Sequence, residues 1–340
     1  MRSGARIVNS CVLVVVAGAL ISCKHPSSKQ AEAAAPAAPV RSGSATSARP
    51  VGVPTAVSAK PSIVPGFKPR CGTEHAPRKD RDRSPMCWVP AGEFVMGTPV
   101  NADRPKDGPA RRIRISRDFY IDEYEVTNEQ FARFLRSRGN NQCGTNTCAA
   151  NEPFEVKAGA ARLPADVSFD GAQAYCAWVG KRLPTEAEWE FAARHDPLTG
   201  VDHRYPWGDV YKKGVTNCWD VKGAQRASLV AVGTYPSDRS SVGAYDMGGN
   251  FSEWVADCYS LVFSCAGDLC VDPLHNASCE QVCSDDGKCE TARELRGGAY
   301  TSEPTSIESK ARTSSFSDGG GGVRCAVSTS DSDKPTTTQR

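Results

Sequence analysis

Cysteine content is the feature that most restricts how this 340-residue chain can fold, because it contains 15 cysteines. Cys11 lies in an apolar N-terminal segment and Cys23 directly follows that segment, so 13 cysteines remain for the rest of the chain. In an exported protein most of these thiols are expected to form disulfides, and an odd number leaves at least one outside a disulfide. Such crosslinks stabilise a domain whose strands are short and whose loops are long.

The N-terminus is typical of a lipoprotein signal peptide over residues 1–22. Arg2 and Arg6 form a basic region, and residues 8–21 are apolar but too short to span a bilayer as a helix. The sequence LISC at 20–23 resembles the lipobox of bacterial lipoproteins, which implies cleavage before Cys23 and acylation of its thiol. An ordinary secretory signal with a chance cysteine is the alternative. The lipoprotein interpretation predicts a protein of the bacterial cell envelope, anchored in a membrane by lipid and facing the periplasm or the exterior.

Composition divides the rest of the chain into a tether, a domain and a tail. Residues 23–85 are rich in Ala, Pro and Ser without an apolar period, which predicts a disordered tether. Residues 86–328 are predicted to form one domain with a cysteine-rich insertion at 258–289, and residues 329–340 a disordered tail. The formal net charge of +2 gives no indication of nucleic-acid binding, so no nucleic-acid partner is expected.

Cysteine spacing predicts some disulfides and leaves others open. Cys71 is expected to pair with Cys87, and Cys143 with Cys148. Three further disulfides are expected within the insertion, although a metal site is the alternative and sequence does not choose their connectivity. Its six cysteines are Cys258, Cys265, Cys270, Cys279, Cys283 and Cys289. Nothing in the sequence assigns partners to the last three, Cys176, Cys218 and Cys325.

Three helices are predicted from capping residues followed by apolar residues at helical spacing. Thr127 with Gln130 and Thr185 with Glu188 fit capping boxes, and Asp170 is expected to cap the helix between them. The acidic residues at 186, 188 and 190 are interpreted as complementing a helix dipole rather than as catalytic groups.

Strand patterns are short and lie early in the domain. Alternating apolar residues at 88–97 and 112–115 predict strands, and loops dominate after about residue 195. The sequence therefore predicts an irregular, loop-rich α+β domain that is low in regular secondary structure and needs crosslinks or bound ions for stability.

Seven phrases, in this order, closely resemble the sulfatase-modifying factor or formylglycine-generating enzyme family. They are VPAGEFVMG at 89–97, DEYEVTN at 122–128, KRLPTEAEWEFAAR at 181–194, YPWG at 205–208, YDMGGNFSEW at 245–254, RGGAY at 296–300 and GVRC at 322–325. The resemblance covers about residues 86–328, and it implies a single irregular α+β domain related to C-type lectins and stabilised by calcium.

The resemblance also implies the ligands of that calcium. They would be the side chains of Asp246 and Glu253 and the carbonyl oxygens of Gly249 and Phe251, a set of oxygen donors that suits a hard cation. A second calcium site of the family would begin at Asn217 and the carbonyl of Cys218, but no downstream acidic partner is recognisable between residues 222 and 229.

Active members of the family oxidise a cysteine of a sulfatase with Cu(I) held by two cysteines in the loop after the Arg-Gly-Gly motif. Ser302 and Ile307 occupy those two positions here, so both thiols are missing and copper binding is doubtful. We therefore expect no catalytic residue and a non-catalytic module that binds a protein, peptide or glycan. An active oxidase that converts a protein cysteine to formylglycine is the alternative, and a scaffold used only for assembly is a third interpretation.

Overall fold

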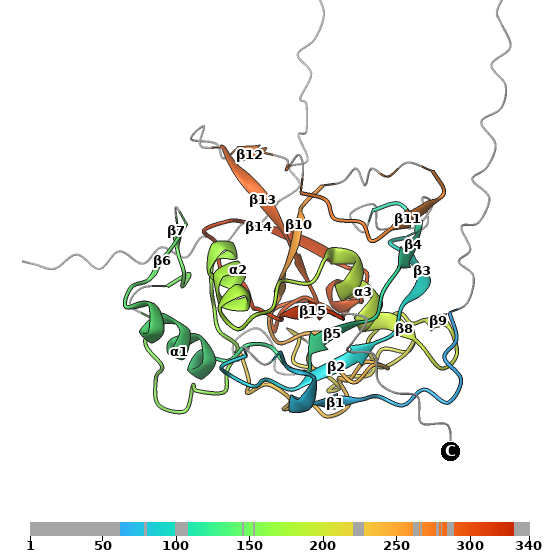
Figure 1. The fold of residues 1–340 in the computed structure, drawn as a ribbon, viewed down its shortest axis with the longest axis horizontal. Coiled ribbons are helices and arrows are strands. Elements are labelled where there is room, and N and C mark those ends of the chain that lie inside the picture. The colour runs from blue at the N-terminus through green and yellow to red at the C-terminus, as the bar shows by residue number, and fades with distance from the viewer. Residues whose placement is uncertain are drawn as a thin grey trace, which may run out of the picture. The chain divides into compact units, whose positions relative to one another are not determined.

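The computed structural model describes residues 62–329, except 78–79, 99–107, 145, 152–153, 220–227, 261–264, 266, 277–278, 280 and 284–288. The expected signal peptide, the expected lipidation residue Cys23, and most of the predicted tether and tail lie outside the described residues. Within the described part, no helix has both the length and the apolar character needed to cross a membrane. Three α-helices and many short strands joined by long loops confirm the predicted α+β class (Figure 1).

The strands form three main sheets and two small hairpins. The first sheet has the order β1 (Cys71–Gly72), β2 (Met86–Val89), β5 (Phe119–Asp122) and β15 (Ala326–Ser328). The second has β10 (Glu253–Cys258), β13 (Cys289–Arg296) and β12 (Gln281–Cys283), with β14 (Arg312–Phe316) also paired to β13. The third has β11 (Leu269–Val271), β4 (Arg111–Ile115) and β3 (Gly92–Met96). The hairpins pair β6 (Gln142–Cys143) with β7 (Asn146–Thr147) and β8 (His195–Asp196) with β9 (Val201–Asp202).

The predicted strands at 88–97 exist, but they belong to different sheets. β2 pairs with β5 and β3 pairs with β4, both in antiparallel register. Pro90 between them has no N–H to donate, and the N–H of Ala91 donates to Asp118 Oδ1 at 2.8 Å instead of to a neighbouring strand. This junction therefore directs the chain from the first sheet into the third.

Two of the three helix starts are as predicted. Reciprocal capping boxes at Thr127 and Thr185 open α1 (Asn128–Arg138) and α3 (Glu186–Arg194). The predicted cap of α2 (Phe169–Trp178) is wrong, because Ser168 Oγ accepts the N–H of Gly171 at 3.0 Å. Asp170 instead lies in the first turn, where a carboxylate complements the helix dipole.

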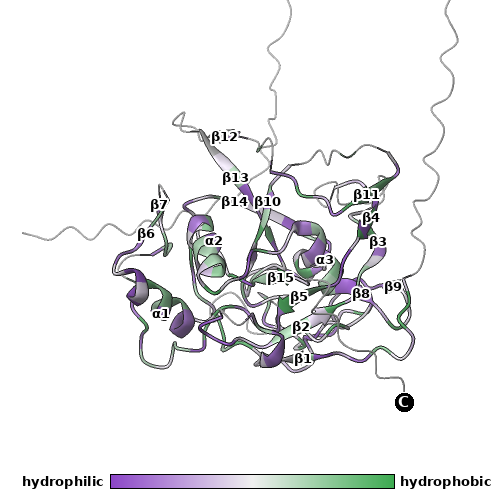
Figure 2. Cartoon of the chain, in the orientation of Figure 1, coloured by the Kyte–Doolittle hydropathy of each residue, from purple (hydrophilic) through white to green (hydrophobic). Residues whose placement is uncertain are grey.

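Among the described residues, apolar side chains collect in two large clusters and in a small third one that contains Tyr205, Cys218 and Ile307. α3 contributes Trp189 and Phe191 to one cluster, together with β3, β4 and β5. α1 and α2 contribute Phe131, Phe134 and Tyr175 to the other, in which Trp254 of β10 also takes part. β5 is buried along its whole length and is correspondingly hydrophobic in Figure 2.

The ordered domain starts earlier than residue 86. Ser62 Oγ accepts the N–H of Glu93 at 2.6 Å, and the N–H of Val64 donates to the carbonyl of Pro197 at 2.6 Å. Phe67 is buried and stacks on Trp88 with 5.9 Å between the ring centroids. The predicted boundary between tether and domain is therefore too late, because these apolar side chains join the core.

Five disulfides lie within the described residues. Cys71–Cys87 and Cys143–Cys148 confirm the two predicted pairs. The third pair, Cys176–Cys325, was left without assignment and joins α2 to the residue before β15. Within the insertion the pairs are Cys258–Cys279 and Cys265–Cys270. Cys283 and Cys289 stand opposite each other in the register of β12 and β13. β11 runs parallel to β4, so the insertion is built into the third sheet.

Candidate functional site

The segment 245–254 forms a tight turn that leads into β10. Asp246 and Asn250 both have left-handed backbone conformations, with φ of 60° and 59°. Gly249 is required by the space around it, because a Cβ there would lie 2.5 Å from Thr216 Oγ1 and 2.7 Å from the carbonyl oxygen of Asn217. The turn thus presses against Thr216 and Asn217, and Asn217 is the residue at which the resemblance implies the start of a second calcium site.

Three of the four predicted calcium ligands have oxygen atoms with spare capacity to bind a cation. The carbonyls of Gly249 and Phe251 accept no backbone hydrogen bond within the described residues. Asp246 is buried, and its Oδ2 accepts the N–H of Gly233 at 2.6 Å. Carboxylate and carbonyl oxygens are the donors that calcium prefers.

Glu253, the fourth predicted ligand, is held by other residues. Its carboxylate accepts the indole N–H of Trp189 at 2.7 Å and three contacts from the guanidinium of Arg324 at 2.8–3.2 Å. Arg324 also donates to the carbonyls of Asp122 and Tyr245, at 2.8 Å and 2.7 Å. Both oxygens of Glu253 are therefore already hydrogen-bonded, so it is the least available of the four predicted ligands.

Buried carboxylates outnumber buried cations around this turn. Glu125, Asp238, Asp246 and Glu253 are each at most 2% exposed, and Arg324 is the buried guanidinium among them. Burial, together with the charge of Asp246, raises the pKa of Asp238 to about 8. Burial raises the pKa of Asp246 to about 6, although the N–H of Gly233 acts in the opposite direction.

Glu125 belongs to the same group of buried carboxyl groups, whose ionised forms are disfavoured without a nearby cation. Burial, together with the charges of Asp246 and Glu253, raises the pKa of Glu125 well above its usual range. One oxygen of Asp238 has no hydrogen-bond partner in the described structure. A divalent cation would offset this excess, so the residues present fit calcium chemically. No three His, Cys, Asp or Glu side chains converge as a metal site in the described part of the chain, so carbonyl oxygens would have to complete the coordination.

The second predicted calcium site lies beside the first. The backbone carbonyl of Asn217 accepts the N–H of Asn250 at 2.9 Å, and the side-chain Nδ2 of Asn217 donates to Asn250 Oδ1 at 3.0 Å. Cys218 is buried, and its sulfur lies 3.6 Å from the hydroxyl of Tyr211. Residues 220–227, from which a further ligand would come, lie outside the described residues.

Neither of the two positions that the resemblance assigns to copper carries a thiol of its own. Ser302 Oγ accepts the N–H of Ala299 at 2.9 Å, and its carbonyl accepts the N–H of Trp219 at 3.0 Å. Ile307 ends the short helix η3 (Pro304–Ile307) and is fully buried in a cluster with Tyr205 and Cys218. A hydroxyl committed to a turn and an enclosed aliphatic chain offer Cu(I) no soft ligand.

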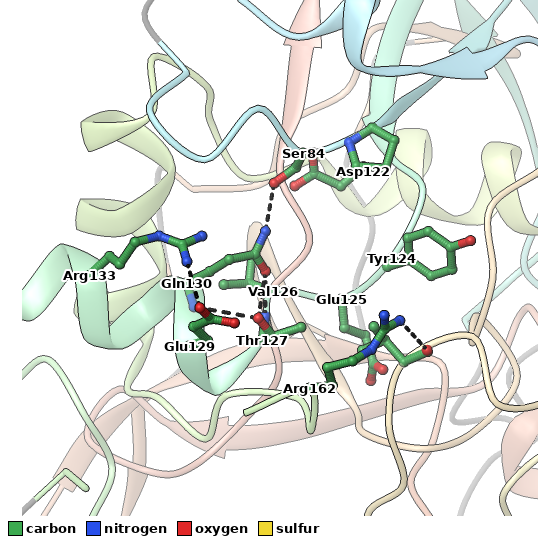
Figure 3. Close-up of a pocket in the computed structure, with 12 residues that line it drawn as sticks. Ser84, Asp122, Tyr124, Glu125, Val126, Thr127, Glu129, Gln130, Arg133 and Arg162 are labelled. Carbon is green, nitrogen blue, oxygen red and sulfur yellow. Dashed lines mark hydrogen bonds and ion pairs between the residues drawn. The ribbon is translucent and has the colours of Figure 1, made fainter. Parts of the chain in front are cut away.

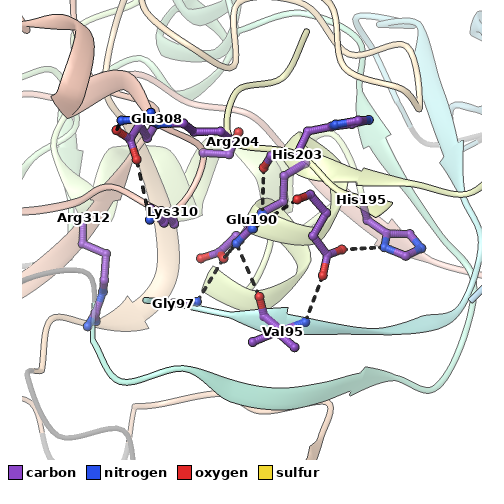
Figure 4. A network of polar contacts seen from close by, with 12 residues as sticks. Val95, Gly97, Glu190, His195, His203, Arg204, Glu308, Lys310 and Arg312 are labelled. Carbon is purple, nitrogen blue, oxygen red and sulfur yellow. Dashed lines mark hydrogen bonds and ion pairs between the residues drawn. The ribbon is translucent and has the colours of Figure 1, made fainter. Parts of the chain in front are cut away.

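Ion pairs hold the loop that carries these two positions. Arg296 donates to Glu186 at 2.9 Å and to Glu190 at 2.5 Å, and all three side chains are buried. Figure 4 shows Glu190 also bonded to the N–H of Gly97, and Glu308 paired with Arg204 at 2.6 Å. Glu186 and Glu190 are therefore structural, as predicted, but they are paired inside the protein rather than simply complementing a dipole.

Sequence reasoning missed the importance of Glu125, Asp238 and Arg324. Glu125 and Arg324 lie in two of the recognised phrases, which signals a role, but only the fold shows that they meet the turn at 245–254. Asp238 lies in a loop without any pattern, and nothing in the sequence indicated its burial.

Three features define the class of this domain. They are the loop-rich α+β fold, the turn at 245–254 with its carboxylate and carbonyl oxygens, and the Arg-Gly-Gly loop, which Arg296 holds against α3. Residues 73–329 match the family described as the sulfatase-modifying factor enzyme 1-like domain. The chain belongs to this family.

Individual relatives include active and inactive proteins. The chain is 33% identical over 218 residues to the mouse "Inactive C-alpha-formylglycine-generating enzyme 2", an alignment that covers 51% of this chain and 69% of that protein. It is 31% identical over 258 residues to the "Formylglycine-generating enzyme" of Streptomyces coelicolor, an alignment that covers 62% of this chain and 77% of that protein. Among solved structures it is similar to PvdO from Pseudomonas aeruginosa, with a TM-score of 0.57 and 26% sequence identity. The match covers 75% of this chain and 98% of PvdO. Family membership alone therefore does not decide whether this chain is a catalyst.

Proposed function

We propose that this chain is an exported, lipid-anchored binding module of the family that does not carry out copper-dependent oxidation. The observation that carries this proposal is the pair Ser302 and Ile307, which occupy the two copper positions. Cu(I) selects thiolate ligands, and a thiol that reacts must also be ionised and exposed. The name of the mouse relative supports the idea that this fold persists in proteins without the activity.

An active oxidase is the second candidate, because Cys218 lies in the same buried cluster as Ile307. This places one thiol beside a copper position. A single buried thiol would replace only one of the two cysteines that the resemblance implies. The balance of these observations favours binding over oxidation.

The partner in this proposal is a protein, a peptide or a glycan at the cell surface. The cysteine-rich insertion supports a recognition role because β11 pairs with β4 and the Cys258–Cys279 disulfide ties the insertion to the end of β10, while Cys265–Cys270 closes a loop within it. Crosslinked backbone loses less conformational entropy on binding than an unconstrained chain does.

Calcium is proposed as the resident ion of the turn at 245–254, held by Asp246, Glu253 and the carbonyls of Gly249 and Phe251. When bound, the ion would supply positive charge to a region where buried carboxylates exceed buried cations. Asn217 and the carbonyl of Cys218 are proposed as part of a second site. The role of the ion in either place is to stabilise the loops rather than to take part in chemistry.

Removal of calcium is expected to lower the melting temperature of the protein by about 5–10 °C, because an ion bound at 100 times its Kd contributes about 2.7 kcal/mol. Asp246→Ala should abolish most of this response to a chelator. Asp268→Ala, at an exposed carboxylate of the insertion, is the matched control and should respond like the parent. A parent protein whose melting temperature is the same with and without chelator would show the calcium assignment to be wrong.

Lipid attachment is expected to require Cys23. A Cys23→Ser protein should incorporate no labelled fatty acid, whereas Cys11→Ser, within the apolar segment, should incorporate as much as the parent. Gel fluorography of the labelled chains measures both. Label on the Cys23→Ser protein would remove the anchor from the proposal.

Cu(I) is expected not to bind stoichiometrically to the parent protein. A competition titration against a Cu(I) chelator measures this directly, and a Ser302→Cys/Ile307→Cys variant, which returns both thiols, is the control. Binding of about one equivalent of Cu(I) by the parent would favour the oxidase instead.

A further inference from the structure

The first described residues, 62–67, form an N-terminal arm that lies against β3 and the β8–β9 hairpin. Ser62 Oγ accepts the N–H of Glu93 at 2.6 Å, and the N–H of Val64 donates to the carbonyl of Pro197 at 2.6 Å. The arm has no charged side chain. Its attachment to the domain therefore depends on hydrogen bonds and apolar packing.

His195 of β8 adds a third polar contact to the arm. Its Nε2 lies 3.1 Å from the carbonyl oxygen of Ser62, and its Nδ1 lies 2.7 Å from Asp202 Oδ1 on β9. The ring is 2% exposed and stacks on Phe191 with 4.4 Å between the ring centroids. The other oxygen of Asp202 accepts the N–H of Val95 at 3.1 Å, so both oxygens of this carboxylate are bonded (Figure 4). The ring therefore connects the arm to two strands of the domain.

Both atoms that face the ring nitrogens are hydrogen-bond acceptors. A carbonyl oxygen and a carboxylate oxygen carry no proton, whereas neutral imidazole has one N–H and one bare nitrogen. Neutral His195 can therefore donate to Ser62 or to Asp202, but not to both. The two contacts together require one additional proton on the pair of His195 and Asp202, whichever of the two groups carries it.

The other charged side chains on the elements packed around the ring have partners of their own. On α3, Arg194 pairs with Glu190 at 2.9 Å. Asp196 of β8 accepts the N–H of Leu198 in its own turn at 2.9 Å. On β3, Glu93 pairs with two arginines of β4. Among the described residues, Asp202 is therefore the carboxylate that compensates the charge of the additional proton.

We propose that His195 and Asp202 form a proton-dependent clasp that holds the N-terminal arm to the domain and releases it as the pH rises. When the additional proton leaves, the ring keeps its N–H toward the carboxylate, because a charge-assisted hydrogen bond is stronger than one to a neutral carbonyl. Nε2 then presents a lone pair to the carbonyl oxygen of Ser62, and the repulsion between them detaches the arm.

The sign of the pH dependence follows from the number of protons. The attached arm holds one proton more than the released arm, so attachment is favoured as the pH falls and lost as the pH rises. Histidine is the side chain best suited to such a change near neutral pH.

The Cys71–Cys87 disulfide limits how much of the chain can be released. It crosslinks β1 to β2 shortly after the arm, so the domain beyond it stays folded when the arm leaves. Release of residues 62–67 would add up to about 20 Å to the reach of a tether. This consequence rests on the proposed lipid anchor at Cys23, whereas the clasp does not, so a chain without lipid should release its arm in the same way.

Hydrogen exchange of the full chain between pH 6 and pH 9 tests the proposal, with single amides resolved by mass spectrometry after electron-transfer fragmentation. The reporter amides are the N–H groups of Val64 and Glu93, which form the other two polar contacts of the arm. After correction for the intrinsic rate, both should exchange about 10-fold faster at pH 9 than at pH 6. The N–H of Gln130 also donates to a hydroxyl oxygen, that of Thr127 at 3.4 Å (Figure 3), and as the matched control it should keep its protection.

Two substitutions should remove the pH dependence in different ways. His195→Gln leaves no group on the ring position that changes its protonation. Asp202→Asn gives the ring a neutral partner that can donate to Nδ1, so Nε2 keeps its proton toward Ser62 and the arm should stay attached at pH 9. His203→Gln removes another histidine that is paired with an aspartate, Asp209 at 3.1 Å, and should behave like the parent.

Reporter amides whose corrected exchange in the parent does not change with pH would overturn the proposal. The same conclusion follows if His195→Gln or Asp202→Asn keeps the pH dependence of the parent. An equal loss of protection at Gln130 would also overturn it, because the whole domain would then be loosening rather than the arm.

Discussion

Arg324→Met is expected to lower the free energy of unfolding by about 3–5 kcal/mol, the largest loss among the single substitutions considered. The guanidinium is fully buried and makes three contacts with Glu253 and two with backbone carbonyls. Methionine has a similar length but no charge, so the substitution leaves Glu253 buried beside Glu125 and Asp246 without a counter-charge. Chemical denaturation followed by tryptophan fluorescence, with calcium held constant, measures the loss.

Two further variants show whether the loss comes from charge. Arg182→Met removes a guanidinium that also contacts a carboxylate in two places, Glu188 at 2.6 Å and 2.7 Å, but it is 39% exposed and should cost no more than about 1 kcal/mol. Glu253→Gln combined with Arg324→Met should recover part of the stability, because the unpaired charge is then removed. If Arg182→Met and Arg324→Met lower the free energy of unfolding equally, burial of the Arg324–Glu253 pair is not what makes Arg324 important.

Removal of the Cys176–Cys325 disulfide is expected to have an effect of similar size. The bond joins residues 149 apart in sequence and both sulfurs are buried. In the chain-entropy description a loop of this length contributes about 5 kcal/mol. The Cys176→Ala/Cys325→Ala variant should therefore unfold at a much lower denaturant concentration than the parent.

The Cys143–Cys148 disulfide is the control for this prediction. It is also buried, but it closes a loop with a sequence separation of 5, for which the same description gives about 2 kcal/mol. Its double alanine variant should retain more stability than the Cys176→Ala/Cys325→Ala variant. If both variants lose the same stability, loop length is not what makes the longer crosslink important.

Local signals in the sequence predicted the local parts of this structure. The capping boxes at Thr127 and Thr185 are correct because an N-cap depends on residues three positions apart. The Cys71–Cys87 and Cys143–Cys148 pairs were predictable from their closeness in sequence. The family phrases predicted the α+β class because they cover the whole domain.

Long-range contacts could not be read in the same way. Cys176 meets Cys325, and Arg324 meets Glu253, because the first two sheets bring the end of the chain back to its middle. The tether boundary was misplaced because Val64 and Phe67 are too few to make an apolar pattern, although both contact the domain, as does the hydroxyl of Ser62. The excess of buried carboxylates depends on burial, which sequence does not show.

Conversion of cysteine to formylglycine is the measurement that tests the central claim most directly. The protein would be incubated with Cu(I), oxygen and a sulfatase-type cysteine peptide, and the peptide followed by mass spectrometry. The Streptomyces coelicolor formylglycine-generating enzyme, run in parallel, is the positive control. With Ser302 and Ile307 at the copper positions, we expect the peptide to keep its thiol. Accumulation of the aldehyde above the level without protein would contradict the assignment of this chain as a binding module.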